Sequence, residues 1–235
     1  MIEVQKMNVA YNMDCMEYMK TLPDKEFDLA VVDPPYGGGA KADAEETFNG
    51  AIVGRFGGWF EKYISAERTG GTWASKYEKQ ISHWDIAPPP EYFEELFRIS
   101  KNQIIWGGNY FQLPPTRCFL IWRKLSISES FTMAMAEYAW TSFNSNAKVF
   151  EHAPQDSKRF HPTQKPKALY DWIFKLYAKP GMRILDTHLG SGSSRIAAYD
   201  AGLDFVGCEI NKEYFDKQEE RFEKHTAQQN LFLME

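Results

Sequence analysis

The chain has 235 residues, 43% of them hydrophobic and 25% charged, a composition that suits one sizeable globular domain or one domain with a small appendage. Its net charge of −5 argues mildly against a nucleic-acid partner, because phosphate binding is mostly electrostatic. No apolar stretch approaches the roughly 18–20 residues that span a bilayer, no secretory signal opens the sequence, and the three cysteines form no C-x-x-C pair. We therefore expect a cytoplasmic protein without a membrane span, a disulfide framework or a metal site.

The first part of the chain alternates strand and helix and then loses its pattern. Apolar runs predict strands at 7–12 and 27–33, with a helix at 14–22 between them. From residue 37 to about residue 86 glycine, charge and aromatic residues follow one another without a sustained period. So long a region without periodicity is typically functional or mobile.

The rest of the chain returns to regular alternation. We expect helices at 89–100, 167–178 and 213–225, strands at 102–108, 118–124 and 136–142, and a complete strand–helix–strand unit within 179–211. This alternation predicts a parallel or mixed sheet with helices on both faces, in which ligands bind at the carboxyl ends of the strands. The strands that end at Asp33 and Asp186 should therefore lie where chemistry takes place.

The strand–helix–strand unit carries the features of a nucleoside site. In "ILDTHLGSGSS" (184–194), Gly190 and Gly192 permit a tight turn and a close approach of a ligand to the backbone. Residue 195 is arginine, so the full dinucleotide fingerprint is absent, and the next strand ends on Glu209, whose carboxylate can accept hydrogen bonds from ribose hydroxyls. A nucleoside cofactor without a pyrophosphate, such as S-adenosylmethionine, fits this pattern better than NAD does. The alternative is a strand–helix turn that merely needs glycine.

Six motifs occur in one order along the chain. They are VVDPPYG (31–37), IIWGGNYF (104–111), EYAWTS (137–142), HPTQKP (161–166), ILDTHLGSGSS (184–194) and GCEIN (207–211). In this order they resemble the S-adenosylmethionine-dependent DNA amino-methyltransferases of the circularly permuted kind, whose catalytic motif precedes the cofactor motif. One departure is Asp-Thr-His at 186–188, where the family usually has Asp-Pro-Phe. It should change packing beside the cofactor but leave binding intact.

The resemblance implies a fold and a domain organisation. We expect a Rossmann-like methyltransferase fold: a mostly parallel, seven-stranded sheet with helices on both faces, circularly permuted, in a single domain over residues 1–235. Residues 38–85 would form a mobile insertion that contacts DNA and reads the target, and 143–160 is the second candidate for that role.

The resemblance also assigns chemistry to the DPPY motif. The lone pair of an exocyclic amine is delocalised into its ring, and two acceptors aimed at its N–H groups would free that lone pair for attack on a methyl group. Asp33 would supply one acceptor and the Pro34 carbonyl the other, while Pro35 stiffens the loop and Tyr36 stacks on a flipped-out base. Asp33 would act by stabilising the positive charge that develops on nitrogen.

Further positions carry over as contacts to the cofactor. The expected set is Asp14, His161, Thr163, Gln164, Lys165, Asp186, Gly190, Ser191, Gly192, Ser193, Glu209 and Asn211. Asp14 could instead be a helix N-cap and Lys165 a surface charge. None of the cysteines lies in a Pro-Cys dipeptide, so methylation of a cytosine ring carbon has no nucleophile here.

The resulting prediction is a site-specific enzyme that methylates adenine N6 in duplex DNA. Adenine leads because Asp-Pro-Pro-Tyr resembles the motif of the adenine enzymes more than the Ser-Pro-Pro-Tyr usual for cytosine N4. Cytosine N4 is the first alternative, and RNA adenine is a weaker one. A protein-glutamine methyltransferase would be expected to have Asn at position 33. From another class, the chain could be a non-catalytic nucleic-acid-binding subunit, although the intact motifs argue against that.

The expected partners are duplex DNA, a second copy of the chain and a cognate restriction enzyme. Basic residues that could contact phosphates are Arg55, Lys62, Arg68, Lys76, Arg123, Lys124, Lys158 and Arg159. The first four are interleaved with aromatic residues, a mixture that suits stacking on bases. Solvated faces explain any one of these clusters equally well.

Overall fold

The computed structural model describes residues 7–36, 86–128, 134–154 and 159–232. The chain divides into two compact units. The first comprises residues 1–34, 89–128 and 134–235, and holds every helix and strand described here. Of the second, residues 35–88 and 129–133, the described part is limited to Pro35, Tyr36 and residues 86–88.

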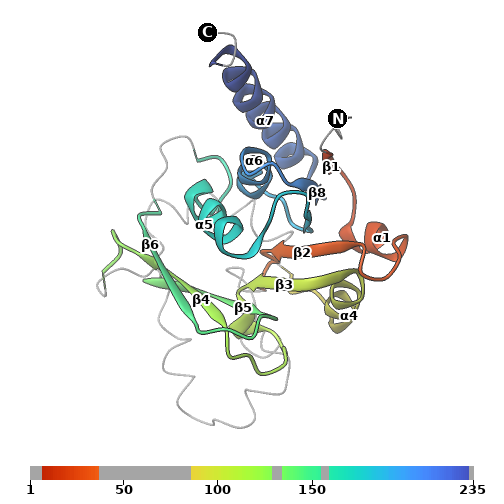
Figure 1. The fold of residues 1–235 in the computed structure, drawn as a ribbon, viewed down its shortest axis with the longest axis vertical. Coiled ribbons are helices and arrows are strands. Elements are labelled where there is room, and N and C mark those ends of the chain that lie inside the picture. The colour runs from red at the N-terminus through yellow and green to blue at the C-terminus, as the bar shows by residue number, and fades with distance from the viewer. Residues whose placement is uncertain (1–6, 37–85, 129–133, 155–158, 233–235) are drawn as a thin grey trace. The chain divides into compact units, whose positions relative to one another are not determined.

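The centre of the first unit is an eight-stranded sheet with the order β1-β8-β7-β2-β3-β5-β4-β6 (Figure 1). The strands are β1 (Asn8–Tyr11), β2 (Phe27–Val32), β3 (Ser100–Trp106), β4 (Phe119–Lys124), β5 (Ala136–Thr141), β6 (Lys148–His152), β7 (Arg183–Asp186) and β8 (Asp204–Cys208). Within this sheet only β5 runs against its neighbours. The expected fold class is confirmed, with one strand more than predicted.

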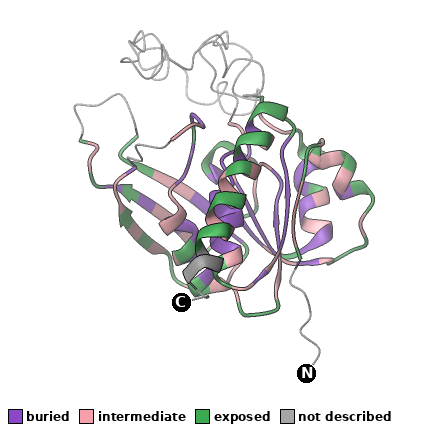
Figure 2. Cartoon of the chain, turned by 90° about the horizontal axis from the view of Figure 1, so that it is seen from above, coloured by how far each residue is buried: buried purple, intermediate pink, exposed green. Residues whose placement is uncertain are grey.

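Helices cover both faces of the sheet, and Figure 2 shows the buried strands between them. On one face α5 (Lys167–Tyr177) and α6 (Ser193–Asp200) pack against Leu29, Val31 and Ile104. On the other, α1 (Cys15–Lys20) and α4 (Pro90–Ile99) pack against Ala30, Val32 and Ile105. The central strand β2 is thus apolar on both faces, which explains why its sequence is a continuous apolar run.

The local sequence accounts for most of these elements. The apolar stripe of α5 is buried at Leu169, Tyr170, Ile173 and Phe174, at the spacing of one helical face. The last helix, α7 (Lys212–Phe232), begins one residue before the prediction and continues seven residues beyond it. Strand β6 lies in the stretch 143–160, where no strand was expected. It is an edge strand, and none of its five residues is fully buried. None of the described helices is long and apolar enough to cross a membrane.

This topology places the predicted site residues at one edge of the sheet. Strands β2, β3, β7 and β8 are parallel, so their carboxyl ends point the same way. Asp33 follows β2, Asp186 ends β7, and Glu209 follows β8. A short 3₁₀ turn, η2 (Gly108–Tyr110), follows β3 at the same edge.

Candidate active site

Asp186 is a buried carboxylate whose hydrogen-bond donors, among the described residues, are all neutral. Its Oδ2 accepts a hydrogen bond from the Ser194 hydroxyl at 2.5 Å, and its Oδ1 accepts one from the backbone N–H of His188 at 3.1 Å. The residue is 2% exposed. Burial raises the pKa of Asp186 to about 7, against the opposing effect of these two hydrogen bonds.

Glu209 closes the loop that follows β7. Its Oε2 accepts a hydrogen bond from the Gly190 N–H at 2.8 Å, and its Oε1 accepts one from the Asn211 N–H at 2.8 Å. Burial raises the pKa of Glu209 as well, although the backbone N–H groups oppose it. A carboxylate offers about four acceptor sites, so Glu209 still has acceptor capacity for the hydroxyls of a ribose.

These two carboxylates fit a cationic cofactor. Among the described residues, no lysine, arginine or histidine forms an ion pair with Asp186 or Glu209. Two buried acids without a cationic partner are costly unless a ligand supplies the positive charge. S-adenosylmethionine carries both a sulfonium and an ammonium group, so its charge matches this part of the site.

Two glycines shape the loop beside Glu209, for different reasons. Gly190 has φ +52°, and a Cβ built on it would lie 3.3 Å from the ring of His161. Gly192 has φ +73°, and its Cβ would lie 3.1 Å from the Cβ of Gln218 on α7. A side chain at either position is strained by its backbone conformation. At Gly192 the added side chain would also meet Gln218 on α7.

The segment 161–166 lies against this glycine loop. The His161 ring packs edge-on against Tyr214, with 4.3 Å between the ring centroids. Burial, with the charges of Arg159 and Lys165, lowers the pKa of His161 to about 3, so the imidazole is neutral at physiological pH. Gln164 is buried, whereas Thr163 is exposed and lies within 3.3 Å of the His161 Nδ1.

Four other residues of the expected cofactor set have identifiable structural contacts. The Asp14 carboxylate caps α1 through the N–H of Met16 at 2.7 Å, and Asn211 caps α7 through the N–H of Glu213 at 3.0 Å. Ser191 and Ser193 lie 3.2 Å apart through their hydroxyls. The guanidinium of Arg221 on α7 donates to the Ser191 carbonyl and to the Ser193 hydroxyl.

Asp33 lies in a set of four charged side chains of alternating sign. Lys165 Nζ lies 2.5 Å from Asp33 Oδ2 and 3.1 Å from Glu137 Oε2, and Lys124 Nζ lies 2.6 Å from Glu137 Oε1. The side chains of Lys165, Lys124 and Asp33 are only 3%, 7% and 14% exposed. Lys165 therefore contacts the candidate catalytic carboxylate directly, through a segment that also borders the cofactor loop.

The remaining residues of the DPPY motif continue out of the first unit. Pro34 is buried and belongs to the first unit, whereas Pro35 and Tyr36 begin the second. Tyr36 is partly buried. The stacking role of Tyr36 stays a prediction.

The expected DNA-contacting residues fall into three groups. Arg55, Lys62, Arg68, Lys76 and Lys158 lie outside the described residues. Lys124 is buried against Glu137, and Arg159 donates to the backbone carbonyls of His161 and Pro162. Arg123 remains on the surface, where it forms an exposed ion pair with Glu151 at 2.8 Å.

Segment 37–85 lies outside the part of the chain that the structure describes. Target reading by this segment therefore stays a prediction. The second candidate, 143–160, contains the edge strand β6.

Sequence reasoning missed several residues that hold the site together. Ser194 binds Asp186, Glu137 pairs with Lys165, and Arg221 braces the glycine loop. Ser194 ends the motif ILDTHLGSGSS (184–194) and Glu137 begins the motif EYAWTS (137–142), but no spacing rule links either residue to its partner. These contacts join segments far apart in the chain, so only the fold reveals them.

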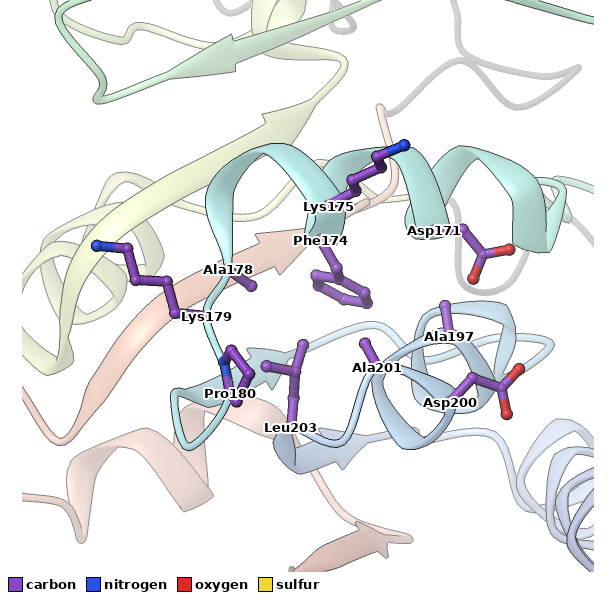
Figure 3. Close-up of a pocket in the computed structure, with 10 residues that line it drawn as sticks. All are labelled: Asp171, Phe174, Lys175, Ala178, Lys179, Pro180, Ala197, Asp200, Ala201 and Leu203. Carbon is purple, nitrogen blue, oxygen red and sulfur yellow. The ribbon is translucent and has the colours of Figure 1, made fainter.

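A separate hollow lies between α5 and α6 at the opposite edge of the sheet (Figure 3). Its lining includes Phe174 and Lys175 on α5, Asp200 on α6, and Pro180 and Leu203, which precede β7 and β8. None of the expected catalytic or cofactor residues lines it. The carboxyl edge of the sheet, and not this hollow, is the candidate active site.

Comparison with known proteins agrees with this geometry. The family model of the N6/N4 type, described as DNA methylase, matches residues 72–220, which is more than half of the chain. The chain belongs to this DNA methylase family. It is a DNA methyltransferase of the N6/N4 class and depends on S-adenosylmethionine.

Individual relatives are distant but cover nearly the whole chain. The type II methyltransferase M.HinfI of Haemophilus influenzae is 23% identical over 257 residues, covering 92% of this chain and 68% of its own. The type II methyltransferase M1.MboII of Moraxella bovis is 22% identical over 272 residues, covering 92% and 96%.

Two solved structures share the fold. The M1.HpyAVI–SAM complex has a TM-score of 0.52 and 18% identity, and the alignment covers 90% of this chain and 97% of that one. The cytosine-N4-specific PvuII DNA methyltransferase has a TM-score of 0.56 and 13% identity, with 93% and 89% covered. At these identities the likeness establishes the methyltransferase fold, which enzymes for both bases share.

Proposed function

We propose that this enzyme methylates the N6 amine of adenine at a specific site in duplex DNA, after the base has been flipped out of the helix. The observation that supports the proposal is the position of Asp33. Asp33 directly follows the central strand β2, and the segment 161–166 contacts both Asp33, through Lys165, and the glycine loop, through His161. The acceptor for the target amine and the cofactor loop thus contact the same segment of the chain.

The roles of the catalytic residues follow from the chemistry of an aromatic amine. Its nitrogen is a poor nucleophile until acceptors engage its N–H groups and free the lone pair. We assign these acceptors to the Asp33 carboxylate and the Pro34 carbonyl, with Pro35 fixing the direction of that carbonyl. Asp33 then stabilises the positive charge on nitrogen until a proton is lost to solvent. Tyr36 is assigned to stacking on the flipped base.

The cofactor contacts are assigned to the other half of the site. When bound, S-adenosylmethionine supplies an electrophilic methyl group on a sulfonium. Asp186 and Glu209 would face its positive charge and its ribose hydroxyls, and Asp14 its adenine amine. The residues assigned to the remaining contacts are His161, Thr163, Gln164, Gly190, Ser191, Gly192, Ser193 and Asn211. Lys165 stands apart from this group because its ammonium contacts Asp33.

Adenine is favoured over cytosine by the residue at position 33. A carboxylate carries a full negative charge and two acceptor oxygens, whereas the serine usual in the cytosine-N4 motif offers a neutral hydroxyl. The proposal further includes duplex DNA read by residues 38–85 within a single methyltransferase domain, a homodimer, a cognate restriction enzyme and a cytoplasmic location, where cellular DNA and the cofactor are both present.

The target base can be tested with the full chain and radiolabelled S-adenosylmethionine. A pool of duplexes containing all short sequence contexts is methylated, digested to nucleosides and separated by chromatography. We expect the label in N6-methyldeoxyadenosine. Label in N4-methyldeoxycytidine alone would show that the base assignment is wrong. A chain that binds S-adenosylmethionine in calorimetry but labels no duplex would favour the non-catalytic alternative.

A further inference from the structure

Lys165 is held between two acidic side chains at the end of the central strand. Its ammonium contacts Asp33 Oδ2 at 2.5 Å and Glu137 Oε2 at 3.1 Å, and the side chain is 3% exposed. It also lies 5.3 Å from the centroid of the buried Trp106 ring, within the range of a cation–π contact. Its position is thus fixed from three directions.

The register of the sheet explains how these groups meet. Val32 on β2 pairs with Ile105 on β3, so the next residues, Asp33 and Trp106, lie side by side. Trp106 in turn pairs with Ala139 on β5. Glu137 lies two residues from Ala139 and therefore on the same face.

The second lysine of the set extends the alternation of charge. Glu137 pairs across the sheet with Trp122 on β4, and Lys124 lies two residues farther along that strand, on the same face. Lys124 Nζ contacts Glu137 Oε1 at 2.6 Å. Two acids and two lysines together carry no net charge, which is how a protein tolerates charges in a buried place.

Glu137 and Lys165 stabilise each other in their charged forms. Burial would raise the pKa of Glu137, but the ammonium groups of Lys165 and Lys124 outweigh it and hold that pKa at about 2. Burial would lower the pKa of Lys165, but Asp33 and Glu137 raise it above its ordinary value. Both residues are therefore charged throughout the pH range in which an enzyme works.

The arrangement matters for a carboxylate that has to stabilise a cation. If Lys165 contacted Asp33 alone, its positive charge would oppose the positive charge that develops on the target amine. Glu137 shares the same ammonium, so Asp33 is held in place by a hydrogen bond while much of its negative charge stays available.

We propose that Lys165 is a positioning residue for Asp33, and that Glu137 sets how strongly Lys165 neutralises it. Lys165 fixes Oδ2 and so orients the carboxylate for the target amine. This inference rests on the proposed role of Asp33 in methyl transfer, and it removes Lys165 from the expected cofactor contacts.

Among the described residues, Lys165, Asp186 on β7 and Tyr170 on α5 act electrostatically on Asp33. Glu137 on β5 pairs with Lys165, and Lys124 on β4 pairs with Glu137. Burial raises the pKa of Tyr170 well above its ordinary value, so it stays neutral. Variants of Lys165 and Glu137 change the two charges that this argument concerns and leave the other three groups in place.

The test measures kcat against pH by tritium transfer from S-adenosylmethionine to duplex DNA, with cofactor affinity measured by calorimetry. Lys165→Met should lower kcat by roughly thirtyfold or more and move the acid limb of the profile up by about one pH unit, because Asp33 loses a cation. Glu137→Gln should move the acid limb down, because Asp33 then no longer shares the Lys165 ammonium with a second carboxylate. Lys165→Arg should restore part of the activity, and cofactor affinity should stay within about threefold in all variants.

Lys101→Met is the matched control. Lys101 pairs at 2.7 Å with Asp28, a carboxylate near the start of β2, whereas Asp33 follows the end of that strand. This variant should leave both kcat and the acid limb unchanged.

Two results would overturn the proposal. One is a Lys165→Met enzyme with the wild-type kcat and an unshifted acid limb. The other is a Lys165→Met enzyme whose cofactor affinity falls by more than about tenfold, which would show that Lys165 contacts the cofactor. Should Lys165→Met fail to fold, Glu137→Gln decides, since its limb must still move to lower pH. A wild-type enzyme that labels cytosine would correct the base assignment alone, because tritium transfer follows either amine.

Discussion

The two halves of the active site treat their buried carboxylates in opposite ways. Asp33 is paired with Lys165 inside a set of charges that sums to zero. Asp186 and Glu209 are held by backbone N–H groups and a serine hydroxyl, without a cation among the described residues. The protein therefore fixes the charge of its catalytic half in advance and leaves the charge of its cofactor half uncompensated.

This difference matches what each half is proposed to bind. Two uncompensated buried acids lower the stability of the free protein. A cofactor with its own positive charge removes this destabilisation when it binds, so its affinity is higher. The target amine arrives neutral and becomes positive only during the reaction. A carboxylate for that purpose needs a fixed orientation before the base arrives, which the ion pair with Lys165 supplies.

The largest expected effect comes from removing the catalytic carboxylate. Asp33→Ala should lower methyl transfer by roughly 10²–10³-fold or more, because the developing charge on nitrogen loses its stabilisation. Cofactor affinity should change by no more than about tenfold, since Asp33 addresses the amine and not the cofactor. Tritium transfer to duplex DNA measures the first quantity and calorimetry the second.

Asp33→Asn separates charge from shape in the same experiment. The amide keeps the size of the side chain but loses its negative charge, and it leaves Lys165 with one acidic neighbour fewer. It should retain little activity. Full turnover by either Asp33 variant would contradict the division of labour between the two halves.

An intermediate effect is expected at Asp186, where stability and binding should change in opposite directions. The pKa of Asp186 is raised to about 7 in the folded chain, whereas an unfolded aspartate has a pKa of about 3.9. Between these values the folded chain binds a proton that the unfolded chain does not, so stability falls as pH rises through this window. Asp186→Asn removes the charge and with it this loss.

Thermal or urea unfolding of the free protein at two pH values tests this directly. The stability advantage of Asp186→Asn over the wild type should be about 3 kcal/mol larger at pH 8 than at pH 4.5. Affinity for S-adenosylmethionine should fall by roughly tenfold or more, because a charged partner is lost. Equal stability at both pH values would show that Asp186 carries no uncompensated charge.

Asp28→Asn is the control of opposite sign. Burial would raise the pKa of Asp28, but the hydrogen bonds from Lys101 and from the Arg183 N–H lower it below its ordinary value. Its charged form therefore stabilises the fold above the pKa of the unfolded chain, and this contribution is lost as pH falls. Asp28→Asn should destabilise the protein at pH 8 and less so at low pH.

Only part of the fold and of the two halves of the site could be predicted from the sequence. The order of strands and helices, the apolar stripe of α5 and the positions of Asp33, Asp186 and Glu209 at strand ends were predictable, because each depends on local periodicity or on one turn. Strand β6 was not, because a short edge strand without a fully buried residue has a weak hydrophobic pattern.

Long-range ion pairing was the other feature that the sequence did not reveal. The partner of Lys165 depends on the register of three strands and on the course of segment 161–166, and a lysine in a motif carries no mark of its partner. The same limit applies to Lys124 and Arg123. They are adjacent in sequence and both were expected to contact DNA, yet Lys124 is buried in the charge set and Arg123 is exposed.

The smallest expected effect concerns DNA affinity and follows from that last pair. Because the charges of the catalytic half are paired and those of the cofactor half are acidic, we expect phosphate contacts to come from other residues, with Arg55, Lys62 and Arg68 as the first candidates. Replacing these three together should flatten the dependence of log affinity on log salt by up to about three contacts. Arg123→Met should flatten it by at most about one contact and Lys124→Met by none, since burial keeps the Lys124 ammonium from phosphate. Fluorescence anisotropy with a labelled duplex over a series of salt concentrations gives each slope. A slope that falls more for Lys124→Met than for the triple variant would mean that the charge set beside Asp33 opens to contact DNA, and that the catalytic half is not compensated in the bound state.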